Sequence, residues 1–199
     1  MKKSLTIFLI IIAIQIPISC DRCGGGEPFE GKISNLESSI GTFESERFVS
    51  KENSDFDKAA IQVEIADLKF SHNSFFLKRF TNPFASQVYA CSPPPPITTQ
   101  KIKEIIISSS KPLFSGGGVF VEGSNLNELF KVSNHDNSSI NEFINDQNED
   151  KYLFGYLGSK IILTLLEKPD SSVNQNFQIK FEFTDLETIE IETGAFKVI

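Results

Sequence analysis

The sequence contains no tryptophan and only three tyrosines, although it has 19 phenylalanines among its 199 residues. Tryptophan and tyrosine dominate the hot spots of protein interfaces and provide rings on which sugars stack, because each joins an apolar ring to a polar group. Their scarcity argues against a carbohydrate-stacking platform and against a strongly adhesive surface. Phenylalanine has no polar group, so the aromatic content predicts a large, dry core instead.

Histidine is almost absent, and this limits the catalytic and metal-binding chemistry that the chain can carry. Only His72 and His135 could act as a general base, and the GxSxG signature of a serine hydrolase is missing. His72 directly follows a predicted strand and His135 lies in a polar run, so we expect both to be solvated loop residues. No zinc ligand set is spaced along the chain, and the sequence predicts neither a metal site nor a cofactor.

Two further stretches have part of a ligand-binding pattern but lack its key residues. The glycines at 116–118 are not followed by the Lys-Ser or Lys-Thr of a phosphate loop, so they predict a turn that needs positive φ angles or close backbone approach. Oxygen side chains alternate at 146–150 as in a calcium loop, but Lys151 and Leu157 occupy the positions that require Gly and Glu. We therefore expect an acidic loop that ends a helix.

Basic residues are outnumbered by acidic ones. The chain has 19 Lys and Arg against 26 Asp and Glu, and loss of Lys2 and Lys3 with an export signal would leave 17. Proteins that bind nucleic acid use clustered basic residues to contact phosphates and to displace counterions. The charge balance therefore argues against a nucleic-acid partner.

The first 20 residues have the layout of an export signal. Lys2 and Lys3 give a positive start, residues 5–18 are nearly all apolar, and Ser19 places a small residue directly before Cys20. This arrangement resembles the lipobox of bacterial lipoproteins. The resemblance implies cleavage before Cys20, and acyl chains on Cys20 that anchor the protein to a membrane.

Two alternatives stay open for this segment, namely ordinary secretory cleavage and a retained membrane-spanning helix. A spanning helix needs about 20 apolar residues. The apolar run here is shorter, and Gln15 and Pro17 interrupt its end. We therefore expect the chain to be anchored to a bilayer through lipid rather than to cross it.

The region after the signal carries four stretches with a further resemblance: Cys20-Asp21, Ile102 to Ser108, Leu126 to Phe130, and the hairpin from Lys168 to Phe183. With these it resembles uncharacterised all-β lipoprotein domains of Gram-negative bacteria. The resemblance implies a place in the cell envelope and no known catalytic residues. Asp21 is similar to a residue that retains some lipoproteins in the inner membrane, but the rule varies among bacteria. We expect the outer membrane, on its periplasmic or surface face.

The chain has only three cysteines. Lipid on Cys20 leaves Cys23 and Cys91 in an oxidising compartment, where disulfides form and persist. A disulfide between Cys23 and Cys91 is therefore one hypothesis. Two free or buried thiols are the alternative, because pairing cannot be deduced from sequence alone.

Alternating apolar and polar residues predict a mainly β fold. Phe177, Ile179, Phe181 and Phe183 share one face of a predicted strand, which we expect to be the core face. Short strands with tight turns favour an antiparallel β-sandwich of the immunoglobulin-like kind over a barrel. A strand that is apolar on both faces, at 102–107, is expected in the middle of the sandwich. The other strands are expected at 61–70, 160–166, 177–184, 188–193 and 196–198.

One or two short helices are predicted between these strands. Residues 125–130 and 139–146 have apolar side chains at helical spacing, and Ser or Asn precedes each as a cap. We expect them to cover an open end of the sandwich. Pro93 to Pro96 is expected to be a polyproline II crossover. The predicted organisation is a signal peptide at 1–19, a flexible tether at 20–28 and a single β-sandwich domain at 29–199.

These features favour a lipid-anchored envelope protein that acts as a non-catalytic binding or structural module. Its expected partners are the membrane, reached through Cys20, and an unknown envelope protein or glycan. The alternative is an envelope hydrolase or glycan-processing enzyme. A pocket lined by converging carboxylates, or His72 within hydrogen-bond reach of a serine, would favour that enzyme. A third class, ligand capture for a transporter, predicts a deep apolar cavity.

Overall fold

The computed structural model describes residues 29–70, 96–149 and 154–198. The predictions made for Cys20, Cys23, Cys91, His72 and the tether lie outside these residues. Contacts divide the chain into two units, and the described residues from Glu30 onward belong to the same one, which comprises 30–70 and 96–199. None of the described helices is long and apolar enough to cross a membrane.

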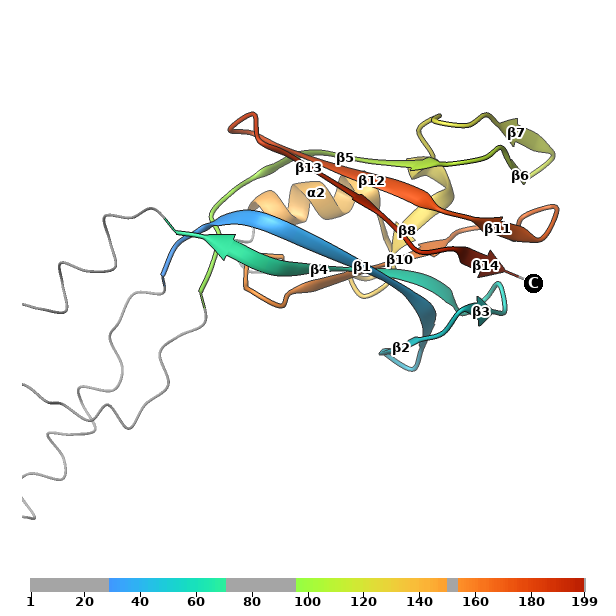
Figure 1. The fold of residues 1–199 in the computed structure, drawn as a ribbon, viewed down its shortest axis with the longest axis horizontal. Coiled ribbons are helices and arrows are strands. Elements are labelled where there is room, and N and C mark those ends of the chain that lie inside the picture. The colour runs from blue at the N-terminus through green and yellow to red at the C-terminus, as the bar shows by residue number, and fades with distance from the viewer. Residues whose placement is uncertain (1–28, 71–95, 150–153, 199) are drawn as a thin grey trace, which may run out of the picture. The chain divides into compact units, whose positions relative to one another are not determined.

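One layer of this unit is a six-stranded sheet in the order β2-β1-β4-β10-β8-β9 (Figure 1), in which every pairing is antiparallel. The side chains at Ala59 to Val63 in β4 are all buried, because β4 lies between two other strands and under the second layer. The strands of this layer are β1 (Lys32–Glu44), β2 (Arg47–Ser50), β4 (Ala59–Lys69), β8 (Phe130–Val132), β9 (Ser138–Ser139) and β10 (Lys160–Leu165).

The longest strand of the described chain, β1, has no clear counterpart among the predicted strands. Its buried residues Ile33 and Leu36 and its partly buried Ile40 stand three and four positions apart, which is the spacing of a helix face. The reason is an irregularity in the pairing with β4 between Ile33 and Leu36, where the register shifts twice. Such a bulge breaks the two-residue alternation by which a strand is recognised in sequence.

The second layer contains a three-stranded antiparallel sheet in the order β13-β12-β5, which runs above β1 and β4 in Figure 1. Phe177, Ile179, Phe181 and Phe183 of β12 are at most 1% exposed, which confirms the predicted core face. The turn at Asp185 to Glu187 joins β12 to β13 as predicted. The strands are β5 (Ile102–Ser109), β12 (Phe177–Phe183) and β13 (Thr188–Glu192).

Five short strands form two smaller sheets. The first has the order β11-β14-β3, with a parallel pairing between β14 and β3. The second is a hairpin of β6 and β7, turned by Gly116 and Gly117 with φ of 58° and 74°, so the prediction of a positive-φ glycine turn is confirmed. The strands are β3 (Asn53–Ser54), β6 (Leu113–Ser115), β7 (Gly118–Phe120), β11 (Val173–Gln175) and β14 (Phe196–Val198).

Both predicted helices are present. The first is a single 3-10 turn, η1 (Asn127–Leu129), and the second is α2 (Ile140–Glu149). Ser139 and Glu142 start α2 with a capping box, in which the Ser139 N–H donates to Glu142 Oε2 at 2.8 Å and the Glu142 N–H donates to Ser139 Oγ at 3.2 Å. The Ser139 N–H, and after it the Ser139 hydroxyl, donate to the Glu142 carboxylate and hold its pKa below the ordinary value. The helix continues to Glu149, so it is longer than the predicted 139–146 and contains most of the stretch at 146–150 that was expected to form an acidic loop.

Phenylalanine rings fill the space between the layers, as the composition predicts. Phe130 of β8 and Phe177 of β12 meet edge to face with centroids 5.4 Å apart, and Phe177 also contacts Phe196 at 5.5 Å. Nearer α2, Phe154 stacks on Phe181 at 6.1 Å. The predicted fold class, a mainly β antiparallel sandwich with short helices, is confirmed.

The position of β5 corrects one prediction. It pairs with β12 alone among the described strands, so it lies at a sheet edge and not in the middle of the sandwich. Asn127 covers part of this edge, since its Oδ1 accepts from the Ile107 N–H at 3.0 Å and its Nδ2 donates to the Ile105 carbonyl at 2.6 Å. Asn148 of α2 makes the same two-way pairing with the backbone of Ile102, at 3.0 and 2.8 Å. Two carboxamides thus take the place of a neighbouring strand.

Candidate functional site

A polar pocket of about 450 Å³ lies beside the covered edge of β5. Three parts of the chain form it: β5, η1 with the segment just before it, and the stretch where β9 ends and α2 begins. The lining residues are Glu104, Asn125, Asn127, Glu128, Ser139, Ile140 and Asn141.

Several of the polar groups in this pocket already hold the local structure. Asn125 Oδ1 accepts from the Asn127 N–H at 2.9 Å, a local turn that starts η1 and sets Asn127 against β5. The Ser139 hydroxyl donates to Glu142 Oε2 at 2.9 Å within the capping box. These side chains shape the pocket and have few hydrogen-bonding groups left to offer a ligand.

Glu104 and Glu128 remain available for binding. Neither carboxylate makes a hydrogen bond or an ion pair with another residue in the described part of the chain. Glu104 is half-buried and Glu128 is exposed. Together with Asn141, they give the pocket two anionic groups and a free carboxamide.

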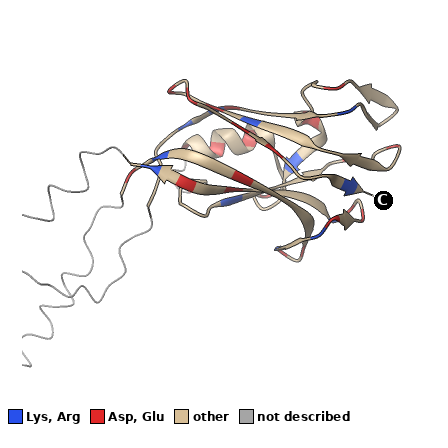
Figure 2. Ribbon diagram, viewed as in Figure 1, with Lys and Arg blue, Asp and Glu red and all other residues tan. Residues whose placement is uncertain are grey.

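On β12, the strand paired with β5, a nearby carboxylate is balanced by lysines. Glu182 of β12 lies directly opposite Glu104 and accepts hydrogen bonds from Lys180 Nζ at 2.6 Å and Lys103 Nζ at 3.2 Å. Lys180, and after it Lys103, hold the pKa of Glu182 below its ordinary value, while Glu182 raises the pKa of Lys180. Figure 2 shows that charges of both signs are spread over both layers. The two pocket carboxylates therefore differ from Glu182 in having no hydrogen-bonded or ion-paired lysine among the described residues, although Glu104 adds a smaller contribution to the raised pKa of Lys180.

The pocket contains the feature that favours the enzyme alternative, since two carboxylates line it. Its setting fits binding better than hydrolysis. A carboxylic acid that donates a proton near neutral pH is kept protonated by burial in an apolar site. Glu128 is exposed, and the hydroxyl of Ser139 is engaged in the helix cap. The pocket offers hydrogen-bond acceptors and negative charge to a bound group.

His135 lies in the turn after β8, as predicted, but its ring is not simply solvated. Its Nε2 lies 3.0 Å from Asp146 Oδ2, and its ring meets Phe143 edge to face with centroids 5.8 Å apart. The side chain is only 20% exposed. Among the described residues, no serine hydroxyl bonds to His135, so this His-Asp pair fastens the turn to α2 and forms no catalytic triad there.

The sequence did not single out the pocket residues. Among the described residues, no group of three or more His, Cys, Asp or Glu is placed to hold a metal ion. The one local signal of the pocket is the capping box at Ser139 and Glu142, because it follows the recognisable S-x-x-E spacing. Glu104 and Glu128 belong to different elements, and no sequence pattern links them.

Comparisons with known proteins add little to this site. No family model matches the chain, and no curated protein matches it. Two solved structures share a distant likeness. The Streptococcus agalactiae AgI/II polypeptide BspA C-terminal domain is 8% identical with a TM-score of 0.26, and the match covers 82% of this chain and 49% of that one. A chain described as BspA_C_mut is 9% identical with a TM-score of 0.27, and the match covers 82% and 46%. This chain spans less than half of either, and neither likeness bears on function.

Proposed function

We propose that this chain is a lipid-anchored protein of the bacterial cell envelope, and that its sandwich is a non-catalytic module that binds another envelope component. Lys2, Lys3, the apolar run at 5–18 and Cys20 support the anchor. Several acyl chains on one cysteine hold a protein at a membrane durably, since each buried methylene contributes about 0.8 kcal/mol. The outer membrane is the proposed location.

The pocket beside β5 is the observation that carries the binding role. It combines the carboxylates of Glu104 and Glu128, which make no hydrogen bond or ion pair with another described residue, with a frame held by β5, η1 and α2. A rigid frame reduces the ordering cost of binding, because its side chains are already in place. Glu128 is exposed and Glu104 is half-buried, so a partner at the surface can reach this pocket.

Recovery of the protein from its own envelope, after cross-linking and with identification of bound partners by mass spectrometry, tests this proposal. The pocket variant carries Glu104→Gln and Glu128→Gln. A matched control carries Glu37→Gln and Glu52→Gln, which remove the same charge from exposed positions that do not line the pocket. We expect one defined partner with the wild type and the control, and its loss with the pocket variant.

Two results would contradict the binding role. One is an equal yield of the partner from the wild type, the pocket variant and the control, which would show that the partner does not bind at the pocket. The other is turnover in a screen of envelope glycans and esters, abolished by Glu104→Gln or Glu128→Gln, with no partner recovered. That second result would establish the hydrolase alternative, for which the two carboxylates of the pocket are the structural argument.

A further inference from the structure

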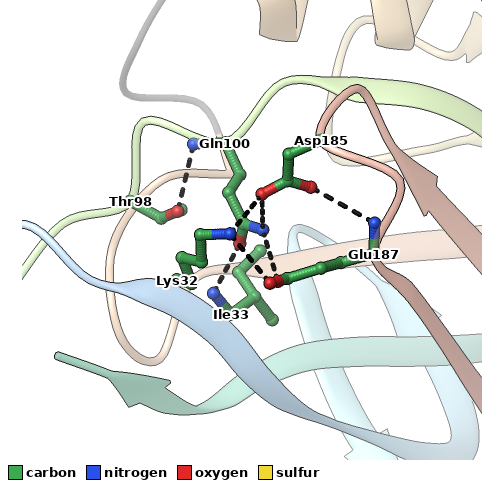
Figure 3. Close-up of polar contacts among 6 residues, drawn as sticks. All are labelled: Lys32, Ile33, Thr98, Gln100, Asp185 and Glu187. Carbon is green, nitrogen blue, oxygen red and sulfur yellow. Dashed lines mark hydrogen bonds and ion pairs between the residues drawn. The ribbon is translucent and has the colours of Figure 1, made fainter. Parts of the chain in front are cut away.

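Side chains from three separate segments meet at the start of β1 (Figure 3). Lys32 Nζ lies 2.7 Å from Asp185 Oδ2 and 2.8 Å from Glu187 Oε1, in the turn between β12 and β13. Gln100 Nε2 donates to the same two carboxylates, at 3.1 Å each. Lys32, Gln100, Asp185 and Glu187 are called the N-terminal clamp below.

The clamp also holds the backbone of β1. Gln100 Oε1 accepts from the Ile33 N–H at 2.6 Å, and the Gln100 N–H is itself fixed by Thr98 Oγ1 at 3.2 Å. Two residues before Ile33, the Gly31 N–H donates to the Ile97 carbonyl at 2.9 Å. The chain therefore enters β1 between two fastened segments, one from residues 97–100 and one from the β12–β13 turn.

The two ends of the described chain lie at opposite ends of β1. Lys32 begins the strand, whereas Gly41, near its other end, accepts a hydrogen bond from the Ser54 hydroxyl at 3.2 Å. Ser54 pairs in turn with Val198, in the last strand. Gly41 follows Lys32 by nine residue steps of extended strand, which is about 30 Å. Figure 1 shows the C-terminal strand at the end away from the start of β1.

Tension between the two ends of the chain therefore acts along β1. Lys32 to Thr42 pair with β4 in an antiparallel ladder, whose hydrogen bonds run across the strand direction. A pull along the strand loads these bonds together and does not open them one after another. On the opposite side, the Ser38 hydroxyl donates to the Glu192 carbonyl of β13 at 3.1 Å, so β1 is also fastened to the second layer.

We propose that the N-terminal clamp gives the domain a mechanical function: it passes tension from the chain before Glu30 into both layers of the sandwich. Lys32 carries part of the pull to the β12–β13 turn, and Gln100 shares it with the backbone of β1. This role rests on the proposed function, since a protein that is anchored through Cys20 and held by a partner at the pocket beside β5 is pulled through the chain before Glu30. Without the clamp, a pull would first peel the start of β1 away from the β12–β13 turn.

Single-molecule force spectroscopy on the full-length chain in detergent micelles tests this proposal with two pulling geometries. In the first, handles are placed at the two ends of the chain, so tension enters through the clamp. In the second, they are placed at Glu46, in the β1–β2 turn, and at the C-terminal end, so tension bypasses it. The variant carries Lys32→Met and Gln100→Ala. The control, Lys160→Met, removes an ion pair with Glu64 of 3.1 Å away from the clamp.

In the end-to-end geometry we expect the clamp variant to unfold about fivefold faster than the wild type at the same force. The control variant should unfold at the wild-type rate, and neither variant should differ in the second geometry. If the clamp variant unfolded faster by the same factor in both geometries, the clamp would only contribute to general stability and the proposal would be wrong. No acceleration in either geometry would also overturn the proposal.

The experiment separates this proposal from the function on which it rests. It uses no membrane anchorage and no partner, so its result is independent of acylation at Cys20. If the protein lacked acyl chains but showed the expected rates, the mechanical role of the clamp would be supported and the proposed source of tension would be wrong. If it carried acyl chains but showed no change that depended on geometry, the anchored binding module would still be supported and the mechanical role would be wrong.

Discussion

The ring of Phe130 in β8 packs edge to face on the ring of Phe177 in β12, with centroids 5.4 Å apart, and so joins the two layers of the sandwich. Both side chains are fully buried. We expect Phe130→Ala and Phe177→Ala each to lower the free energy of unfolding by about 3–5 kcal/mol, through lost transfer energy and the cavity left behind. Denaturant titration measures both values.

The control for this pair is Phe114→Ala, because Phe114 is 46% exposed and has less burial to lose. The double variant should show a coupling of about 0.5–1.5 kcal/mol between the two rings. If the losses of unfolding free energy for Phe130→Ala and Phe177→Ala were strictly additive, or if Phe114→Ala lost as much as they do, the stabilising contact between these two rings would be contradicted.

Gly41 is required by close backbone approach. A Cβ at this position would lie 2.2 Å from the carbonyl oxygen of Val49 and 2.8 Å from the ring of Phe48, in the neighbouring strand. We expect Gly41→Ala to cost about 1–3 kcal/mol as β2 is pushed away. At Gly194 the nearest atom to a Cβ is the end of Ile40, at 3.7 Å, so Gly194→Ala should leave stability nearly unchanged. Equal melting shifts for the two variants would refute the argument.

The carboxamide of Asn127 is expected to protect the edge of β5. Asn127→Asp places an acceptor beside the Ile105 carbonyl in place of the donor now 2.6 Å away, and leaves that carbonyl unpaired. The expected loss is about 1–3 kcal/mol, the penalty for an unsatisfied polar group. Asn141→Asp is the matched control, since it introduces the same charge at a residue of the same pocket. If the two variants were equally stable by denaturant titration, the edge would not depend on Asn127.

The pair of Lys32 and Asp185 predicts a pH dependence with two limits. Lys32 holds the pKa of Asp185 below its ordinary value, so this contribution to stability is present above that value and is lost as the pH falls through the lowered pKa. Asp185, followed by Glu187, raises the pKa of Lys32, so its contribution is present below the ordinary lysine value and is lost as the pH rises through the raised pKa.

Unfolding of the wild type and of Lys32→Met across the pH range tests these signs. The difference in free energy between them should be largest near neutral pH and should shrink in strong acid and in strong alkali. Lys51→Met, at an exposed lysine outside the clamp, serves as the control. A difference between wild type and Lys32→Met that stayed constant from acid to alkali would contradict the ion pair.

Patterns within one strand were sufficient to predict β12 and β13, because alternation of side chains is a local property of the extended backbone. The edge position of β5 could not be predicted in this way. Ile102, Ile105 and Ile107 look like a central strand, because residues far along the chain cover its edge: Asn127 lies 20 residues from Ile107, and Asn148 lies 46 from Ile102. β1 was missed because its bulge gives Ile33 and Leu36 the wrong period.

The pocket was beyond sequence reasoning for a related reason. Glu104, Glu128 and Asn141 are close only because η1 and the start of α2 both pack beside β5. Nothing in the residues themselves distinguishes the two glutamates from the other acidic side chains. By contrast, Ser139 and Glu142 lie three positions apart, so the helix start that frames the pocket could be predicted.

The central claim of this account is that Cys20 carries lipid and that the sandwich is displayed from it. Mass spectrometry of the protein isolated from the envelope of its own cells tests this claim most directly. The account predicts a chain that begins at Cys20, with the added mass of acyl chains on that residue. A chain that still begins at Met1, or a chain with an unmodified Cys20 thiol, would contradict it.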